Sequence, residues 1–207
     1  MLEDRKKFSI ITNYPIILAS KSIIRKVILK KVGIKFKCVN SNLDESNTKN
    51  KLKGKKFNEL CKKLAQEKAL KVSYKYNNSY IIGADQVCVF GGKIINKPLS
   101  KRRAIDQLLM LEGKEHKQIS SCCVCFNGKI LGSFNETSIL KMRKLSRKDI
   151  TNYVAADSPL QSCGSYKFEA RGYLLFSKIK GNHFTIQGMP LVSLLNFFLE
   201  KKIVSYG

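Results

Sequence analysis

Hydrophobic and polar positions along the chain predict short strands mixed with amphipathic helices. Apolar β-branched runs and alternating segments predict strands at 15–19, 33–39, 80–89, 118–126, 129–134, 137–142 and 173–179. Apolar residues that recur every three or four positions predict helices at 23–31, 57–74, 100–111, 147–155 and from 188 onward. Hairpin signals stand beside strand–helix units, so the order predicts an α/β fold whose mixed sheet is flanked by helices and carries a cleft.

The stretch Tyr80–Val89 contains the strongest candidate for chemistry. Its apolar residues predict a buried strand that breaks at Gly83 and resumes at Val87, with Asp85 just past the strand end. Open α/β sheets bind ligands at strand ends, and a carboxylate in that place is a candidate general base or metal ligand. The alternative is a turn aspartate that accepts hydrogen bonds from backbone amides.

Two basic residues are candidates for contacts with a phosphorylated ligand. The strand at 15–19 runs into a helix capped by Ser22, and the free N–H groups of such a helix start attract anions. Arg25 in the first turn could add a bidentate bond to phosphate, although an ordinary capped turn with a surface arginine has the same pattern. Lys68 lies close to the apolar stripe of the helix at 57–74, so its ammonium either reaches water or points into the cleft.

Acidic residues of a predicted polar loop at 40–56 are candidates for a metal site. This loop contains Asp44-Glu45, and together with Asp85 these carboxylates could hold a divalent cation through oxygen ligands. A solvated acidic turn is the alternative.

The chain length and the net charge favour one domain with a solvated basic surface. The 207 residues are enough for a sizeable core, and we place a single domain with two lobes at 14–207, after a loose extension at 1–13. Within it, residues 157–172 lack a clean period and are predicted to form a functional loop or a linker. The net charge of +24 comes mostly from lysines spread along the chain. No nucleic-acid-binding motif accompanies them, so we expect an anionic small substrate rather than a nucleic-acid partner.

The seven cysteines are predicted to be reduced and to pack as small hydrophobic residues. Strand alternation places Cys123 and Cys125 on one face and Cys122 on the other. No zinc site is expected, because ligand spacing is missing. The start of the chain lacks the apolar segment of a signal peptide and no apolar stretch has membrane-spanning length, so we expect a cytoplasmic protein without a membrane partner.

Six short motifs occur in order between residues 15 and 200. They are Leu18-Ala-Ser-Lys-Ser-Ile-Ile-Arg25, Leu43-Asp-Glu45, Ala65-Gln-Glu-Lys-Ala69, Gly83-Ala-Asp-Gln-Val87, Lys97-Pro-Leu99 and Gly188-Met-Pro-Leu191. Together they resemble the Maf family of nucleotide pyrophosphatases. The resemblance implies a bent, twisted mixed sheet with two lobes and a cleft, a fold shared with inosine triphosphatases. It also implies hydrolysis of a nucleoside triphosphate to the monophosphate and pyrophosphate, with Mg²⁺ or Mn²⁺ as the divalent metal cation.

The resemblance further implies roles for single residues. Asp85 would accept a proton from the attacking water and would hold the metal together with Glu45. The residues that would bind the triphosphate are Ser20, Arg25, Lys68 and Lys97.

Two positions look like the branch of this family that acts on 7-methyl-GTP. The branch that acts on dTTP and UTP typically has Thr after the key Asp and Gln at the end of a later motif, where this chain has Gln86 and Glu169. The Glu169 carboxylate can accept from guanine N1–H and the 2-amino group, and the Gln86 amide can donate or accept. Ile24 stands where 7-methyl-GTP enzymes can have an aromatic residue, so it is a third specificity position.

Two other functions stay open. One is a dTTP/UTP or broad-range pyrophosphatase of the same family. The other is a non-catalytic nucleotide- or RNA-binding regulator of cell division. A homodimer is one of the assemblies open to such a chain.

Overall fold

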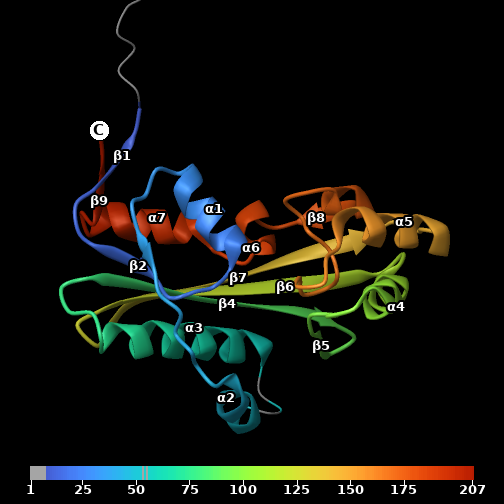
Figure 1. Cartoon of the computed structure of the whole chain (residues 1–207), viewed down its shortest axis with the longest axis horizontal. Coiled ribbons are helices and arrows are strands. Elements are labelled where there is room, and N and C mark those ends of the chain that lie inside the picture. The colour runs from blue at the N-terminus through green and yellow to red at the C-terminus, as the bar shows by residue number, and fades with distance from the viewer. Residues whose placement is uncertain (1–7, 53, 55) are drawn as a thin grey trace, which may run out of the picture.

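A mixed β-sheet runs through the computed structural model, which describes residues 8–52, 54 and 56–207 (Figure 1). Its strands are β2 (Ile16–Leu18), β3 (Lys37–Cys38), β4 (Tyr80–Phe90), β5 (Lys93–Ile95), β6 (Glu115–Phe126), β7 (Lys129–Met142) and β8 (Phe176–Lys180). The order across the sheet is β3-β2-β4-β6-β7-β8, and β5 pairs with β4. β2 is parallel to β3 and β4, whereas the pairs β4–β5, β4–β6, β6–β7 and β7–β8 are antiparallel. The predicted mixed sheet is therefore confirmed.

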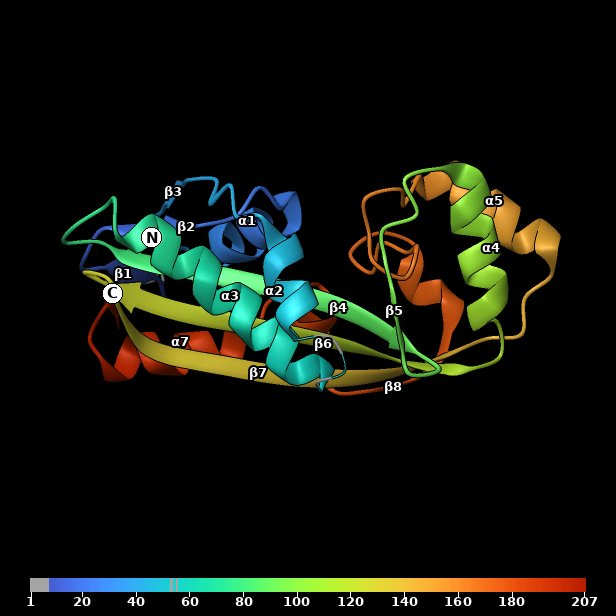
Figure 2. The same ribbon diagram turned by 90° about the horizontal axis from the view of Figure 1, so that it is seen from below.

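Helices cover both faces of this sheet. The described helices are α1 (Ile23–Lys31), α2 (Glu45–Lys51), α3 (Phe57–Ser73), α4 (Lys101–Leu111), α5 (Arg147–Asp157), α6 (His183–Ile186) and α7 (Leu191–Glu200), with a 3-10 turn η1 at Gly172–Leu175. In Figure 1, α3 lies along one face of the long strands and α1, α6 and α7 lie on the other. Figure 2 shows α4 and α5 as a second group, at the opposite end of the long strands from α3 and α7. Among the described residues, no helix is both long and apolar enough to cross a membrane.

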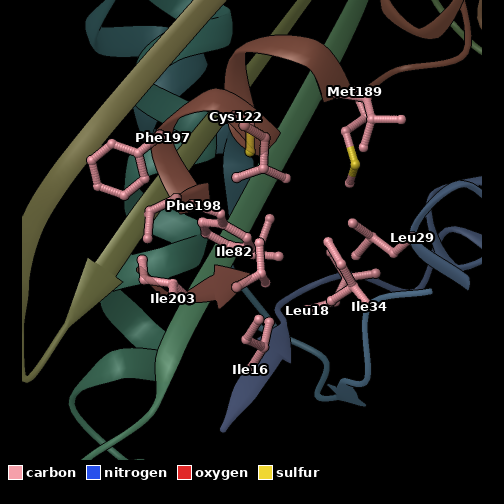
Figure 3. Packing of buried hydrophobic residues seen from close by; sticks show 14 of the residues in the cluster. Ile16, Leu18, Leu29, Ile34, Ile82, Cys122, Met189, Phe197, Phe198 and Ile203 are labelled. Carbon is pink, nitrogen blue, oxygen red and sulfur yellow. The ribbon is translucent and has the colours of Figure 1, made fainter. Parts of the chain in front are cut away.

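Separate apolar clusters hold the helices against the sheet. On the α7 face, Leu18, Ile82, Cys122, Met189 and Phe198 are fully buried in one cluster (Figure 3). A second cluster packs α3 against the other face, and a third packs α4 and α5 against β7 and η1. Each fully buried side chain of this size contributes about 1.5–3 kcal/mol, so the clusters fix where each helix lies on the sheet.

β4 is continuous, which corrects the predicted break at Gly83. Its pairing with β6 runs through Gly83↔Cys123 and Asp85↔Ser121, so Asp85 lies inside the strand rather than past its end. Glycine is required for another reason. A Cβ at position 83 would lie 2.2 Å from the carbonyl oxygen of Ala65, so the glycine allows α3 to pack directly on the strand.

One edge of β4 lacks a strand partner next to Asp85. β2 pairs with this edge as far as Ile82, and β5 begins to pair at Cys88. Between them, over residues 83–87, no strand of the described chain pairs with this edge. Side chains can bond to backbone groups there, and the Ala84 carbonyl accepts a hydrogen bond from the Arg25 guanidinium at 2.9 Å.

The segment 40–56, predicted to be a loop, contains the helix α2. The Asp44 side chain caps this helix by accepting a hydrogen bond from the Ser46 N–H at 3.0 Å. The pattern concealed the helix because only Thr48 among its residues is buried, so it has no apolar stripe. Its first residue is Glu45, one of the predicted metal ligands.

The two chain ends pair with each other, which the sequence analysis did not predict. The loose extension was expected at 1–13. Residues 1–7 of it lie outside the described residues, whereas β1 (Ile10–Thr12) pairs with β9 (Val204–Tyr206) in a two-stranded antiparallel sheet. Strands of three residues carry too little pattern to be recognised locally.

Several element boundaries also differ from the prediction, and the strand predicted at 33–39 is the two-residue strand β3 (Lys37–Cys38). The strands predicted at 129–134 and 137–142 are one strand, β7, whose pairing with β6 continues through Asn135 and Glu136. The strand predicted at 173–179 begins as the turn η1, and α6 (His183–Ile186) lies in a segment where no helix was predicted. These differences leave the predicted order of strands and helices otherwise unchanged.

Burial agrees with the cysteine prediction at five of the seven positions, whereas Cys38 is exposed and Cys163 is partly exposed. Cys122 is buried in the cluster beneath α7, while Cys123 and Cys125 are buried in the cluster beneath α3. All seven thiols are free, and the five buried cysteines contribute to packing as small apolar side chains.

Candidate functional site

A lysine ammonium lies between two carboxylates beside the unpaired edge of β4. Nζ of Lys68 on α3 lies 2.6 Å from Oδ1 of Asp85 and 2.8 Å from Oε1 of Glu45. The side chains of Lys68 and Asp85 are only 13% and 10% exposed, whereas that of Glu45 is 33% exposed. Glu45 also pairs with Lys49 at 2.7 Å. Three residues predicted from separate motifs thus form one cluster, which joins α2, α3 and β4.

Burial and neighbouring charges act in opposite directions on these carboxyl groups. Burial raises the pKa of Asp85 above its usual value of 3.8, and the positive charges of Lys68 and Arg25 oppose that rise. Burial also favours the neutral form of Glu45, but hydrogen bonds from Lys49 and Lys68 outweigh it and lower the pKa of Glu45 to about 2. Asp85 is therefore the carboxylate that takes up a proton more readily, and Glu45 stays ionised.

Arg25 connects the start of α1 to the edge of β4. Ser22 caps the helix by accepting from the Arg25 N–H at 3.4 Å. The guanidinium then donates to the Gly188 carbonyl at 2.9 Å, to the Ala84 carbonyl at 2.9 Å and to Ser20 Oγ at 3.3 Å. These bonds use Nε and Nη1, and Nη2 donates to no residue in the described part of the chain. The fixed guanidinium therefore keeps a nitrogen that can bind an anion.

Gln86 lies on the face of the sheet opposite Asp85, because neighbouring residues of a strand alternate. Its amide donates to the Ile186 carbonyl at 2.7 Å and to Oε1 of Gln118 at 3.0 Å. Gln118 was not among the residues predicted to be functional. A signal was present, since Gln118 is a polar side chain at the start of the strand predicted at 118–126, and it is 1% exposed.

Other predicted residues are not joined to this cluster by direct contacts. Lys97 is exposed in the segment between β5 and α4, and its charge acts on the Cys163 thiol, as do the charges of Asp85 and Arg25. Glu169 is exposed, and its charge acts on Tyr153 of α5.

Ile24 is also outside the cluster of charged residues. It is partly buried and packs against the apolar cluster beneath α7. The structure therefore brings Arg25 and Lys68 close enough for their charges to act on Asp85, whereas Ile24 and Glu169 have no direct contact with that carboxylate.

The donor set suits a divalent cation that is bound together with a substrate. In the described residues, no group of three or more His, Cys, Asp or Glu side chains could hold a metal ion. Asp85 and Glu45 nevertheless converge on one point, which the Lys68 ammonium occupies. Mg²⁺ is typically held by one or two carboxylates, with water and substrate phosphates completing its coordination. The two carboxylates fit that description and do not form a closed structural site.

Comparisons with known proteins agree with the motif order. The Maf-like protein family profile matches residues 15–201. A protein of Legionella pneumophila (strain Corby) named nucleoside triphosphate pyrophosphatase is 43% identical over 190 residues, which cover 92% of this chain and 95% of that protein. A protein of the same name from Rhodopseudomonas palustris (strain BisB18) is 36% identical and covers 93% and 96% of the two chains. Among solved structures, the Ham1 protein of Staphylococcus aureus aligns with a TM-score of 0.47 and 16% identity, over 91% of this chain and 99% of that one. The family match spans nearly the whole chain, and this protein belongs to the Maf family.

Proposed function

We propose that this protein hydrolyses nucleoside triphosphates to the monophosphate and pyrophosphate. The observation that carries the proposal is the cluster in which Lys68 lies between Asp85 and Glu45, beside the guanidinium of Arg25. The cluster combines a buried carboxylate that can accept a proton with fixed positive groups for phosphate oxygens. The relatives named nucleoside triphosphate pyrophosphatase support the same activity.

In the proposed reaction, Asp85 accepts a proton from a water molecule. The water oxygen attacks the α-phosphorus, the bond to the oxygen that bridges the α- and β-phosphates breaks, and pyrophosphate leaves. The raised pKa of Asp85 suits this role, because a general base works best when its pKa approaches the working pH. Mg²⁺ or Mn²⁺, held by Asp85 and Glu45, would supply positive charge that stabilises the phosphate oxygens.

The basic residues bind the triphosphate in this proposal. Nη2 of Arg25 has no partner among the described residues and donates to a phosphate oxygen. The Lys68 ammonium leaves Glu45 and contacts phosphate while it stays close to Asp85. Ser20 orients the guanidinium through its 3.3 Å contact with Nη1, and Lys97 approaches from the segment before α4. Such preorganised charges are usually the main contribution to catalysis of phosphoryl transfer.

We further propose that the preferred substrate is 7-methyl-GTP. Gln86 and the acidic Glu169 support this preference, because both can accept from the donors on the edge of guanine. Ile24, on α1, packs against the apolar cluster beneath α7 and would set the shape of that part of the site. The competing proposal is a dTTP/UTP or broad-range pyrophosphatase, which uses the same cluster around Asp85 and differs only in contacts to the base.

The test is pyrophosphate release with Mg²⁺ or Mn²⁺ from 7-methyl-GTP, GTP, dTTP, UTP and CTP. We expect the highest kcat/KM for 7-methyl-GTP, and a higher rate with dTTP or UTP would favour the competing proposal. Asp85→Asn should abolish most turnover, whereas Asp149→Asn, which changes an exposed helix cap, should not. A folded protein that releases no pyrophosphate from any of these would contradict the enzymatic proposal and favour a non-catalytic nucleotide- or RNA-binding regulator.

A further inference from the structure

A buried hydrogen-bond network behind Gln86 determines what this residue can offer to a ligand. We infer that Gln118 and Tyr166 are positioning residues, which hold the Gln86 carboxamide with its NH₂ group toward the protein and its oxygen toward the ligand. Position 86 would then recognise a hydrogen-bond donor on the base. The inference rests on the proposed function, because it assumes that Gln86 faces a nucleotide.

The orientation of the Gln86 amide follows from the groups around its nitrogen. This nitrogen lies 2.7 Å from the Ile186 carbonyl oxygen and 3.0 Å from Oε1 of Gln118, with the Thr185 carbonyl oxygen at 3.5 Å. A carboxamide nitrogen carries two hydrogens, and both have an acceptor here. A flipped amide would place its own oxygen against these oxygens, so the Ile186 carbonyl fixes which end faces inward.

The orientation of Gln118 is fixed in the same way. Its nitrogen donates to the Tyr166 hydroxyl at 2.7 Å and to the Cys163 carbonyl at 3.3 Å, which leaves Oε1 as the acceptor for Gln86. Gln118 and Tyr166 are 1% and 4% exposed. Water cannot replace a lost partner at such positions, so a reversed amide would leave buried polar groups unpaired.

The network ends at His116, whose Nε2 lies 2.9 Å from the Tyr166 hydroxyl. Burial lowers the pKa of His116 to about 4, so its ring is neutral at neutral pH. The Tyr166 oxygen accepts from Gln118, and its proton is available for the neutral imidazole. The hydroxyl is therefore paired on both sides, which keeps the Gln118 amide in one orientation.

The side-chain oxygen of Gln86 is the group of this hydrogen-bond network that is left to bind a ligand. Oε1 accepts no hydrogen bond from the residues that the structure describes. It lies beside the turn at Gly188, where a Cβ would be 2.9 Å from Oε1 and 3.4 Å from Nη2 of Arg25. A free acceptor and a free donor thus lie at the same glycine, on the side from which Arg25 reaches the edge of β4.

An acceptor at this position discriminates among purine bases. Guanine and 7-methylguanine carry an N1–H and a 2-amino group on their Watson–Crick edge, whereas the N1 of adenine is an acceptor and would face Oε1 unfavourably. The proposed network therefore favours guanine nucleotides over adenine nucleotides. Gln118 and Tyr166 contribute without touching the base.

The test compares Tyr166→Phe and Gln118→Met with the control Tyr153→Phe. The Tyr153 hydroxyl also accepts a backbone hydrogen bond, from Lys167 N–H at 2.9 Å, but it has no contact with Gln86. The measurements are kcat/KM for GTP and ATP, and equilibrium binding of the α,β-methylene analogues of both, which the proposed reaction cannot cleave. We expect Tyr166→Phe and Gln118→Met to lower the preference for GTP over ATP, in kcat/KM and in analogue affinity, about 3- to 10-fold. This is the effect of one net hydrogen bond, and the control should leave the preference unchanged.

The outcomes separate this inference from the proposed activity. The inference is overturned if the wild-type protein binds the two analogues equally. It is also overturned if both variants keep the wild-type GTP/ATP ratio of kcat/KM, or if they lose kcat/KM equally for GTP and ATP. Hydrolysis would still stand in these cases. If no triphosphate is cleaved but the variants narrow the ratio of analogue affinities, the inference stands and the proposed reaction does not.

Discussion

Lys68→Met gives a direct test of how the cluster around Asp85 is balanced. Methionine keeps much of the unbranched side-chain volume on α3 and removes the ammonium that lies 2.6 Å from Asp85. Glu45 keeps its pair with Lys49 at 2.7 Å. The change therefore acts mainly on the Asp85 carboxylate, which is 10% exposed.

The expected loss of stability follows from leaving a buried charge without its closest partner. Removal of one partner from a fully buried pair costs about 3–5 kcal/mol. Two features reduce this figure. The charge of Arg25 still acts on Asp85, and the carboxyl group can take up a proton. We therefore expect a loss of about 2–3 kcal/mol near neutral pH.

The sign of the pH dependence follows from the pKa of Asp85. Burial already holds this pKa above 3.8 in the folded protein, and loss of the Lys68 charge raises it further. A carboxyl group with a raised folded pKa binds more protons in the folded state than in the unfolded state. Stability then falls as pH rises from the unfolded pKa toward the folded pKa. The deficit of Lys68→Met should be largest at neutral pH and should shrink at about pH 4.5, where Asp85 is closer to neutral in both proteins.

Urea denaturation near neutral pH and at about pH 4.5 measures these losses of stability. The proteins compared are the wild type, Lys68→Met, Asp85→Asn and the double variant. Asp85→Asn should restore most of the stability that Lys68→Met loses, because it removes the uncompensated charge. An equal loss at both pH values, or a double variant no more stable than Lys68→Met, would refute the reasoning and would indicate a loss of packing on α3.

Three further predictions concern the same region. Asp85→Asn should lower kcat at least about 100-fold, as expected for loss of a general base. Its circular dichroism spectrum should be unchanged. A variant with the kcat of the wild type would exclude Asp85 as the base. Glu45→Gln should flatten the decline of stability between about pH 5 and pH 2 in denaturation curves, because the folded pKa of Glu45 is about 2 and its stabilising charge is lost as pH falls; a decline as steep as that of the wild type would contradict this. Gly83→Ala should destabilise the fold by about 3 kcal/mol or more in urea denaturation, because its Cβ would lie 2.2 Å from the Ala65 carbonyl oxygen. A change below about 0.5 kcal/mol would show that α3 can move away.

The sequence identified those parts of the fold that depend on neighbouring residues. The helix α5 begins with a capping box between Ser146 and Asp149, as its Ser-x-x-Asp pattern allows. The turn Asn127-Gly128 joins β6 to β7, with both residues at positive φ. The alternation of the cysteines in β6 also gave the correct faces. In each case the signal and the structure span only a few residues.

Local pattern was less informative where packing between distant segments decides the structure. Gly83 was interpreted as a break in the strand, yet it serves the close approach of α3, which sequence spacing does not reveal. The helix α2 has no apolar stripe, and it carries Glu45 to Lys68 only because it lies against α3. The strands at the two chain ends have three residues each and exist only through their mutual pairing.

The sequence by itself determined the candidate residues, namely a carboxylate in a buried strand, an arginine in the first turn of a capped helix and a lysine beside an apolar stripe. The tertiary structure decided how they act on one another. It placed the Lys68 ammonium between two carboxylates, and it fixed the Gln86 amide through Gln118 and the Ile186 carbonyl. The physical reason is the distance along the sequence between the groups that interact. Helix periodicity, caps and turns depend on contacts within a few residues, whereas the pKa of Asp85 and the orientation of the Gln86 amide depend on groups that only the folded chain brings within hydrogen-bond distance.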